Sequence, residues 1–349
     1  MRSRTRPVTA RRWRFRASLA IAVPASVAGL LFGPAGPAHA AGPLVYVPDT
    51  NADTVSVIDA STNTVTATVP LSTDPEYTAV TPDGSQVFVT SNYSVSVIST
   101  ASDTVTATVP LSDYTSDTGG YARQVVVDPA GAFAYVVTQA GYVVQISTAT
   151  DAVTGAVYLG NISPRAIAIA PDGATLYVSG LSGSVGVVDT ASLTVSSVIS
   201  TGESQSFAIA VTPDGSGVYV AYNHGINVLE SDVAVISTAT GQVTARVPIS
   251  PIQDSLEGIA VTPDGASVYV TVGDQHEIAV ISTASNTVAA TIPGLAQPVS
   301  VAFDAAGTTA WVSQLDAGNG SVAAVDTASD TITGTVSGFQ FPFGLSVSG

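Results

Sequence analysis

A unit of about 42 residues recurs along most of the chain, and it restricts the fold more than any other feature of the sequence. Each copy contains a turn that ends in glycine, as in "VTPDGASVYVT", with an aromatic residue four positions later. The turn glycines are Gly84, Gly131, Gly173, Gly215, Gly265 and Gly307, at spacings of 47, 42, 42, 50 and 42. The aromatic residues are Phe88, Tyr135, Tyr177, Tyr219, Tyr269 and Trp311, and the pair Gly42 and Tyr46 marks a seventh copy.

Each copy has the pattern of four short β-strands. Alternating Val, Ile and Thr residues are bounded by Pro, Asp, Gly, Ser and Asn, which is typical of strands joined by tight turns. Four-stranded units repeated around an axis form the blades of a propeller, and closing the ring protects the sheet edges. The sequence therefore predicts an all-β fold, a seven-bladed β-propeller of four-stranded antiparallel blades.

The two ends of the repeat region are predicted to share one blade. The final segment "FPFGLSVSG" matches a first strand, whereas the copy that begins "GPLVYVPDT" lacks one. We therefore expect the N- and C-termini to form a composite blade from 43–71 plus 342–349, within a propeller domain at 41–349. The remaining blades are expected at 75–111, 121–159, 163–200, 205–249, 256–293 and 297–335.

The repeat also resembles a known family. The segments "YVPDTNADTVSVIDASTNTVTATVPL" and "IAVTPDGASVYVTVGDQHEIAVISTASNTVAATI" are similar to the YVTN-type β-propeller repeat, although "FVTSN" and "YVSGL" only approximate the tetrapeptide of that name. The resemblance implies a propeller of the kind found in exported bacterial proteins and archaeal surface-layer proteins. It implies no particular chemistry, because one fold carries many functions.

The first forty residues differ from the rest. They contain seven of the ten arginines, followed by an apolar run and the sequence "PAHA". This is the pattern of a secretory signal peptide at 1–40, with cleavage after Ala40, and it predicts a secreted or cell-surface protein. Arg11 and Arg12 leave the general secretory and twin-arginine routes both open.

Beyond Ala40 the chain is strongly acidic. It has no lysine and no cysteine, and its three arginines face 26 acidic residues, for a formal net charge of −23. Such a field repels nucleic acid and anionic membrane surfaces. We expect no nucleic-acid partner, no membrane insertion after signal cleavage, no cofactor and no disulfide, and we expect a monomer.

Most polar and aromatic residues of the repeat have structural explanations. The turn carboxylates are expected to accept bonds from nearby backbone amides, and they are Asp83, Asp128, Asp172, Asp214, Asp264 and Asp304. The repeated aromatic residues are expected to pack between blades. Insertions beyond the basic period fall at 112–122, 222–232, 250–257 and 314–320, all predicted on one face, which favours that face as the site of function.

One repeat position varies in charge while its neighbours do not. It lies eight residues before each turn glycine, at the predicted mouth of the central funnel, and is occupied by Glu76, Arg123, Arg165, Phe207, Glu257 and Val299, with Phe343 at the matching place in the composite blade. Two arginines on adjacent blades suit a carboxylate or a phosphate, because guanidinium offers a planar fork of donors. The alternative is that Arg123 and Arg165 pair with Glu76 or nearby aspartates and close the channel.

Two histidines give a second, weaker hint. His224 and His276 are both expected in loops of the same face, with Asp274, Glu277 and Glu257 near them by blade order. They could supply acid–base groups or metal ligands, or be solvated loop residues. Their spacing matches no known metal motif, so no metal is predicted.

Three functional hypotheses remain open from the sequence. The first is a secreted binding module for a small anionic ligand, a glycan or a protein loop, with ligand-binding candidates Arg123, Arg165, Glu76, Glu257, Phe207 and Phe343. The second is a hydrolase, lyase or isomerase, since seven-bladed lactonases resemble this architecture. Its catalytic candidates are Glu76 or Glu257 as base and His224 or His276 as proton donor. The third is a structural cell-surface protein.

Overall fold

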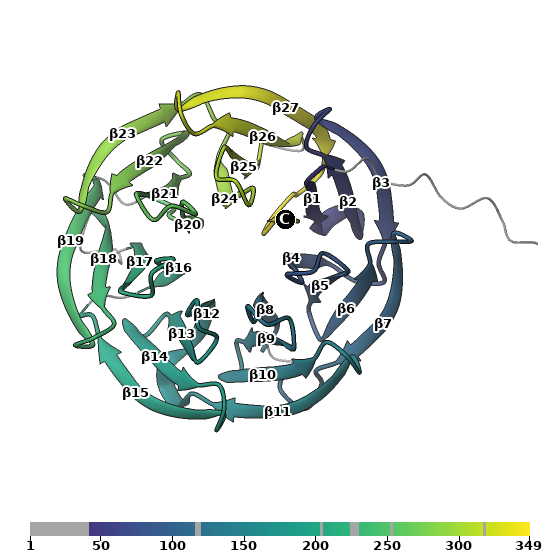
Figure 1. Cartoon of the computed structure of the whole chain (residues 1–349), viewed down its shortest axis with the longest axis horizontal. Helices are drawn as coiled ribbons and strands as arrows, with labels where there is room; N and C mark the ends of the chain where they lie inside the picture. The colour runs from purple at the N-terminus through teal and green to yellow at the C-terminus, as the bar shows by residue number, and fades with distance from the viewer. Residues whose placement is uncertain (1–41, 116–119, 203–204, 224–229, 252–253, 317–318) are drawn as a thin grey trace, which may run out of the picture. The chain divides into compact units, whose positions relative to one another are not determined.

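Seven antiparallel sheets of four strands each are arranged as the blades of a ring (Figure 1). The computed structural model describes residues 42–115, 120–202, 205–223, 230–251, 254–316 and 319–349. In these residues the only helical elements are two 3₁₀ turns, η1 (Thr50–Ala52) and η2 (Gly160–Ile162). The predicted seven-bladed β-propeller is confirmed.

In each of the six continuous blades the chain runs from the innermost to the outermost strand. The first three of these blades comprise β4 (Pro75–Val80), β5 (Gln86–Ser91), β6 (Ser94–Ser99) and β7 (Thr104–Pro110); β8 (Ala122–Val127), β9 (Phe133–Thr138), β10 (Tyr142–Ser147) and β11 (Ala152–Tyr158); and β12 (Pro164–Ile169), β13 (Thr175–Gly180), β14 (Ser184–Asp189) and β15 (Thr194–Ser200). The next three comprise β16 (Ser206–Val211), β17 (Gly217–Asn223), β18 (Ser231–Ser237) and β19 (Gln242–Ser250); β20 (Ile259–Val261), β21 (Ser267–Val272), β22 (Glu277–Ser282) and β23 (Thr287–Pro293); and β24 (Pro298–Phe303), β25 (Thr309–Gln314), β26 (Gly320–Asp326) and β27 (Thr331–Phe339).

The seventh blade contains both ends of the described chain. Its strand order is β28 (Ser346–Val347), β1 (Leu44–Asp49), β2 (Thr54–Asp59) and β3 (Thr64–Pro70), and β28 pairs with β1 in antiparallel fashion. The segment before β28 also bonds to the next blade, because Gly344 N donates to Glu76 O at 2.8 Å and Thr78 N donates to Gly344 O at 2.9 Å. The C-terminal segment thus joins two blades.

The repeated aromatic residues are buried between blades, as the repeat predicts. Tyr46, Phe88, Tyr135, Tyr177, Tyr219, Tyr269 and Trp311 are each at most 7% exposed. Some of them also bond to the following blade. Tyr219 Oη donates to Asn286 Oδ1 at 2.7 Å, and Tyr269 Oη donates to Asp330 Oδ1 at 2.5 Å. Both acceptors occupy the left-handed position of the turn between third and fourth strands.

The aspartates of the inner turns bond locally, as expected. Asp83 Oδ1 accepts from Thr81 Oγ1 at 2.6 Å and from Ser85 N at 3.0 Å, and Asp214 and Asp264 make the corresponding bonds. These turns end each inner strand at the face opposite to the predicted funnel mouth. None of the helices in the described part of the chain is long and apolar enough to cross a membrane.

Candidate functional site

The residues predicted to surround the funnel stand at irregularities in the inner strands. In five blades the pairing of the inner strand with its neighbour skips at least one residue near its start. The skipped positions include Glu76, Arg123, Arg165, Phe207 and Val299. A β-bulge leaves its extra residue out of the ladder and redirects its side chain. The bulges therefore free this position from the regular in-and-out alternation of a strand.

A cavity of about 240 Å³ lies where these residues meet, and we call it the funnel cavity. It is lined by Tyr77, Arg123, Arg165, Phe207, Glu257, Leu315, Phe341 and Phe343. Five of the six residues predicted to bind a ligand are therefore brought together around one space. The sixth, Glu76, contacts Arg123 but does not line the cavity, and Val299 is buried at 5% exposure.

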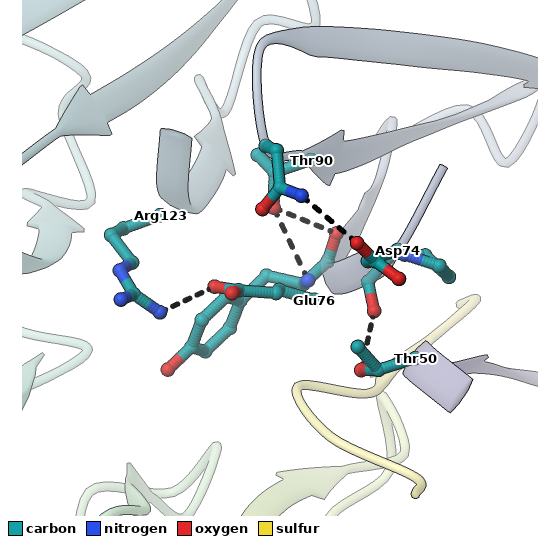
Figure 2. A network of polar contacts seen from close by, with 8 residues as sticks. Thr50, Asp74, Glu76, Thr90 and Arg123 are labelled. Carbon is teal, nitrogen blue, oxygen red and sulfur yellow. Dashed lines mark hydrogen bonds and ion pairs between the residues drawn. The ribbon is translucent and has the colours of Figure 1, made fainter. Parts of the chain in front are cut away.

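Arg123 and Glu76 form an ion pair between adjacent blades. Arg123 Nη1 lies 2.7 Å from Glu76 Oε2, and the two side chains are 20% and 17% exposed. Figure 2 shows Arg123 reaching Glu76 from the side, with polar contacts of Thr90, Asp74 and Thr50 around the segment that carries Glu76. Burial raises the pKa of Glu76 above its ordinary value, although the Arg123 guanidinium acts against this shift.

Arg165 occupies the same position on the next blade and lies over an aromatic ring. Its Cζ is 5.7 Å from the centroid of the Phe207 ring, a cation–π arrangement. Burial, and then the positive charge of Arg123, lower the pKa of Arg165 from its ordinary value. The cost of holding two cations close together in a half-buried place is offset when an anion binds beside them.

Tyr77 divides the inside of the ring into two spaces. Below the funnel cavity lies a second cavity of about 210 Å³, which we call the channel cavity. Tyr77, Phe207 and Glu257 line both cavities, so they form the floor of one and the roof of the other. Burial, followed by the charges of Glu76 and Glu257, raises the pKa of Tyr77, which stays neutral and can act as a hydrogen-bond donor.

Three residues of the funnel cavity were not among those predicted from the repeat. Tyr77 follows the variable position directly, and it is the one aromatic residue there, since the other copies have Gln124, Ala166, Ala208, Gly258, Ser300 and Gly344. Leu315 follows β25 in a loop, and Phe341 lies between β27 and β28. The repeat places the segments of both residues at the funnel face, in the insertion 314–320 and in the final segment from Phe341, but it does not indicate that their side chains line the cavity.

The histidine candidates do not join this cavity. His276 is exposed and lies in the turn before β22, where its Nδ1 accepts a hydrogen bond from Gln297 N at 3.1 Å. It does not line the funnel cavity. His224 lies outside the described residues. No group of three or more His, Cys, Asp or Glu side chains that could hold a metal ion occurs in the described ranges.

A larger groove, of about 550 Å³, lies between two blades near the inner turns. Its lining includes Asp214, Asp264 and Asn286, which are already bonded to Thr212, Thr262 and Tyr219 of the repeat. The polar side chains of this groove are therefore held by two kinds of hydrogen bond that recur around the ring. One kind lies within the inner turns, and the other comes from the aromatic residues packed between blades. The funnel cavity differs because its charged residues belong to the position that varies between copies.

Comparison with known proteins supports the fold alone. A scan of protein-family models and a search of curated protein sequences found no match. Among solved structures, the chain is similar to the Kuenenia stuttgartiensis hydrazine synthase, with a TM-score of 0.71 and 24% identity. The likeness covers 81% of this chain and 92% of that one. At this level of identity it shows a shared propeller architecture and transfers no activity.

Proposed function

We propose that this chain is a secreted β-propeller of the YVTN-repeat type that binds a small anionic ligand in its funnel cavity. The observation that carries the proposal is that Arg123 and Arg165, on adjacent blades, both line one cavity of about 240 Å³. They are two of only three arginines beyond Ala40 in a chain without lysine. Their placement brings two of the few cationic side chains of an acidic chain to one cavity, where they meet the carboxylates of Glu76 and Glu257.

The surroundings of the two arginines support binding. Both project from bulges of inner strands, so they are held by the rigid sheet and not by a long loop. Glu76, which does not itself line the cavity, pairs with Arg123 and so fixes the direction of the guanidinium. A fixed pair of guanidinium groups loses little conformational freedom when it receives a carboxylate or phosphate.

Isothermal titration calorimetry tests the proposal. The purified protein is titrated with acetate, propionate, phosphate, glucuronate and 3-phenylpropionate at low ionic strength. We expect at least one anion to bind and Arg165→Ala to weaken it by roughly tenfold or more, as for loss of a charged hydrogen bond. Arg246→Ala is the matched control, because Arg246 lies on outer strand β19 and pairs with Asp232 at 3.3 Å.

The proposal fails if no anion binds, or if Arg246→Ala weakens binding as much as Arg165→Ala does. The first result favours a structural cell-surface role. The second means that the arginines act only through the overall charge of the molecule.

One observation keeps a catalytic function as a second candidate. Glu257 lines the same cavity as the two arginines and its Oε1 accepts from Ser255 Oγ at 2.9 Å. A carboxylate facing an arginine clamp is the arrangement that a lyase or isomerase needs for proton abstraction beside a bound carboxylate. Nuclear magnetic resonance of each bound anion over time tests this candidate. Turnover that disappears in Glu257→Gln, while binding remains, would establish catalysis.

A further inference from the structure

The funnel cavity has two chemically different walls. Arg123 and Arg165 come from β8 and β12, which lie next to each other in the ring (Figure 1). Leu315, Phe341 and Phe343 come from the β24–β27 blade and the C-terminal segment. In the ring order the β24–β27 blade, which carries Leu315, lies three blades from both β8 and β12, whereas the composite blade, which includes the C-terminal segment with Phe341 and Phe343, lies two blades from β8 and three from β12 (Figure 1). A ligand that fills the cavity therefore meets the two guanidinium groups on one side and hydrocarbon on the other, with Phe207, Tyr77 and the Glu257 carboxylate completing the lining.

We call Leu315, Phe341 and Phe343 the apolar wall, and hydrogen bonds to the main chain of its two phenylalanines hold it in place. Asp49 accepts hydrogen bonds from Gln340 N at 2.8 Å and from Phe341 N at 2.7 Å, and Thr50 N donates to Phe341 O at 3.0 Å. Ser313 Oγ donates to Phe343 O at 2.7 Å. These bonds use main-chain atoms of the two phenylalanines, so their rings remain available to a ligand.

The aromatic rings of this wall also support one another. The rings of Phe341 and Phe343 are stacked with centroids 6.0 Å apart, and Phe343 meets Tyr77 edge to face at 5.2 Å. Such contacts keep the rings in one arrangement before a ligand arrives, which lowers the entropy cost of binding. Tyr77 forms the floor and limits how far a ligand can enter.

This arrangement does not suit a fully hydrated anion. A phosphate or a sugar acid that reached the arginines would displace water from Leu315, Phe341 and Phe343 and leave its own polar groups against hydrocarbon. A carboxylate attached to an apolar body satisfies both walls, because burying apolar surface adds to the charged contact.

We infer that the funnel cavity selects a compact apolar monocarboxylate, with the carboxylate at Arg123 and Arg165 and an aryl or branched alkyl group at Phe341, Phe343 and Leu315. This inference rests on the proposed function, since it requires an anion in the funnel, and it adds the class of ligand. Phosphate and sugar acids are thereby excluded as preferred ligands.

Calorimetry with four matched probes tests the inference. The probes are 3-phenylpropionate, propionate, 3-phenylpropan-1-ol and glucuronate, titrated into the purified protein at one pH and one ionic strength. We expect 3-phenylpropionate to bind about tenfold or more tightly than each of the others, which lack the aryl group, the charge or the apolar body respectively.

Variants then assign the selectivity to the two walls. Phe341→Ala should reduce the affinity for 3-phenylpropionate about tenfold and leave that for propionate unchanged. Arg165→Ala should weaken both carboxylates. Tyr158→Ala is the matched control, because it removes an aromatic ring that is 57% exposed at the end of outer strand β11. If Phe341→Ala does not fold, as judged by circular dichroism, Leu315→Ala tests the same wall.

The possible failures can be told apart. If propionate or glucuronate binds as tightly as 3-phenylpropionate, and Arg165→Ala weakens it, the anion-binding proposal stands and the inference about an apolar ligand is overturned. If 3-phenylpropan-1-ol binds as tightly as 3-phenylpropionate, the anion proposal fails and the inference fails with it. If none of the four probes binds, the inference is overturned, and the anion proposal fails as well only when acetate and phosphate do not bind either. An unchanged affinity of Phe341→Ala and Leu315→Ala also overturns the inference.

Discussion

Tyr77 and Gly344 form a parallel β-bridge that joins the C-terminal segment to the first continuous blade. A Cβ atom at Gly344 would collide with the Tyr77 ring, so the closure of the propeller depends on the absence of a side chain at this position. The same contact places Tyr77 between the funnel and channel cavities. Ring closure and the floor of the candidate site therefore share one packing arrangement.

The first prediction concerns this contact. Gly344→Ala should lower the free energy of unfolding by about 1–3 kcal/mol, the usual cost of overpacking a buried site. Tyr77→Ala in the same chain should recover part of the loss, because it removes the ring that the new methyl group meets. Urea unfolding of the two single variants and the double variant measures the coupling. Strictly additive effects would contradict the proposed collision.

The repeat was sufficient to predict the fold because the six continuous blades share the same inner turn, the same buried aromatic position and the same strand order. It also brought Arg123 and Arg165 to the same end of adjacent inner strands. It could not predict the bulges, since a skipped residue such as Arg165 changes the pairing of the backbone without changing the residue pattern. Phe341 and Leu315 lie outside the observed strands, so the repeat could place their segments at the same face as the arginines but could not show that their side chains line the same cavity.

The second prediction concerns contacts between blades. Tyr269→Phe removes the hydrogen bond from Tyr269 Oη to Asp330 Oδ1, and it should lower the free energy of unfolding by about 1–3 kcal/mol, as for a bond to a charged group. Tyr177→Phe is the control, because the equivalent turn residue of the next blade is Gly241, which has no side-chain acceptor. Urea denaturation should show a smaller effect for Tyr177→Phe, and equal losses would contradict a specific role for Asp330.

The third prediction concerns stability in acid. Hydrogen bonds from Thr81 and Ser85 lower the pKa of Asp83 to about 2, and bonds from Thr212 and Ser216 lower that of Asp214 to about 2. A carboxylate with a depressed pKa in the folded state contributes stability above its ordinary pKa and loses it as the pH falls through the folded value. The melting temperature should therefore fall between about pH 4 and pH 2.

Variants of these two turns provide the control for the acid prediction. Replacing both Asp83 and Asp214 with Asn should flatten the dependence of the melting temperature on pH below about 4. Asp53→Asn makes the same kind of charge change at an exposed position outside these turns. If Asp53→Asn flattens the curve as much as each turn substitution does alone, the effect belongs to net charge and not to the hydrogen bonds of the turns.

The fourth prediction concerns Glu76, whose pKa shift has the opposite sign. Burial raises the pKa of Glu76, and Asp74 adds to this, while Arg123 and Arg165 act against it. The folded state therefore binds more protons than the unfolded state just above the ordinary pKa of a glutamate, about 4.3. Stability from this group is present below that pH and is lost as the pH rises through the higher pKa of the folded state.

Differential scanning calorimetry of wild type and Glu76→Gln from pH 4 to pH 8 isolates this contribution. The wild-type melting temperature should decline relative to that of Glu76→Gln as the pH rises from about 4.3. Arg123→Ala should move the decline to higher pH, because it removes the guanidinium that favours the charged carboxylate at 2.7 Å. A constant difference between wild type and Glu76→Gln over this range would show that the Glu76 pKa is unaltered by folding. In that case Glu76 would serve only to orient Arg123.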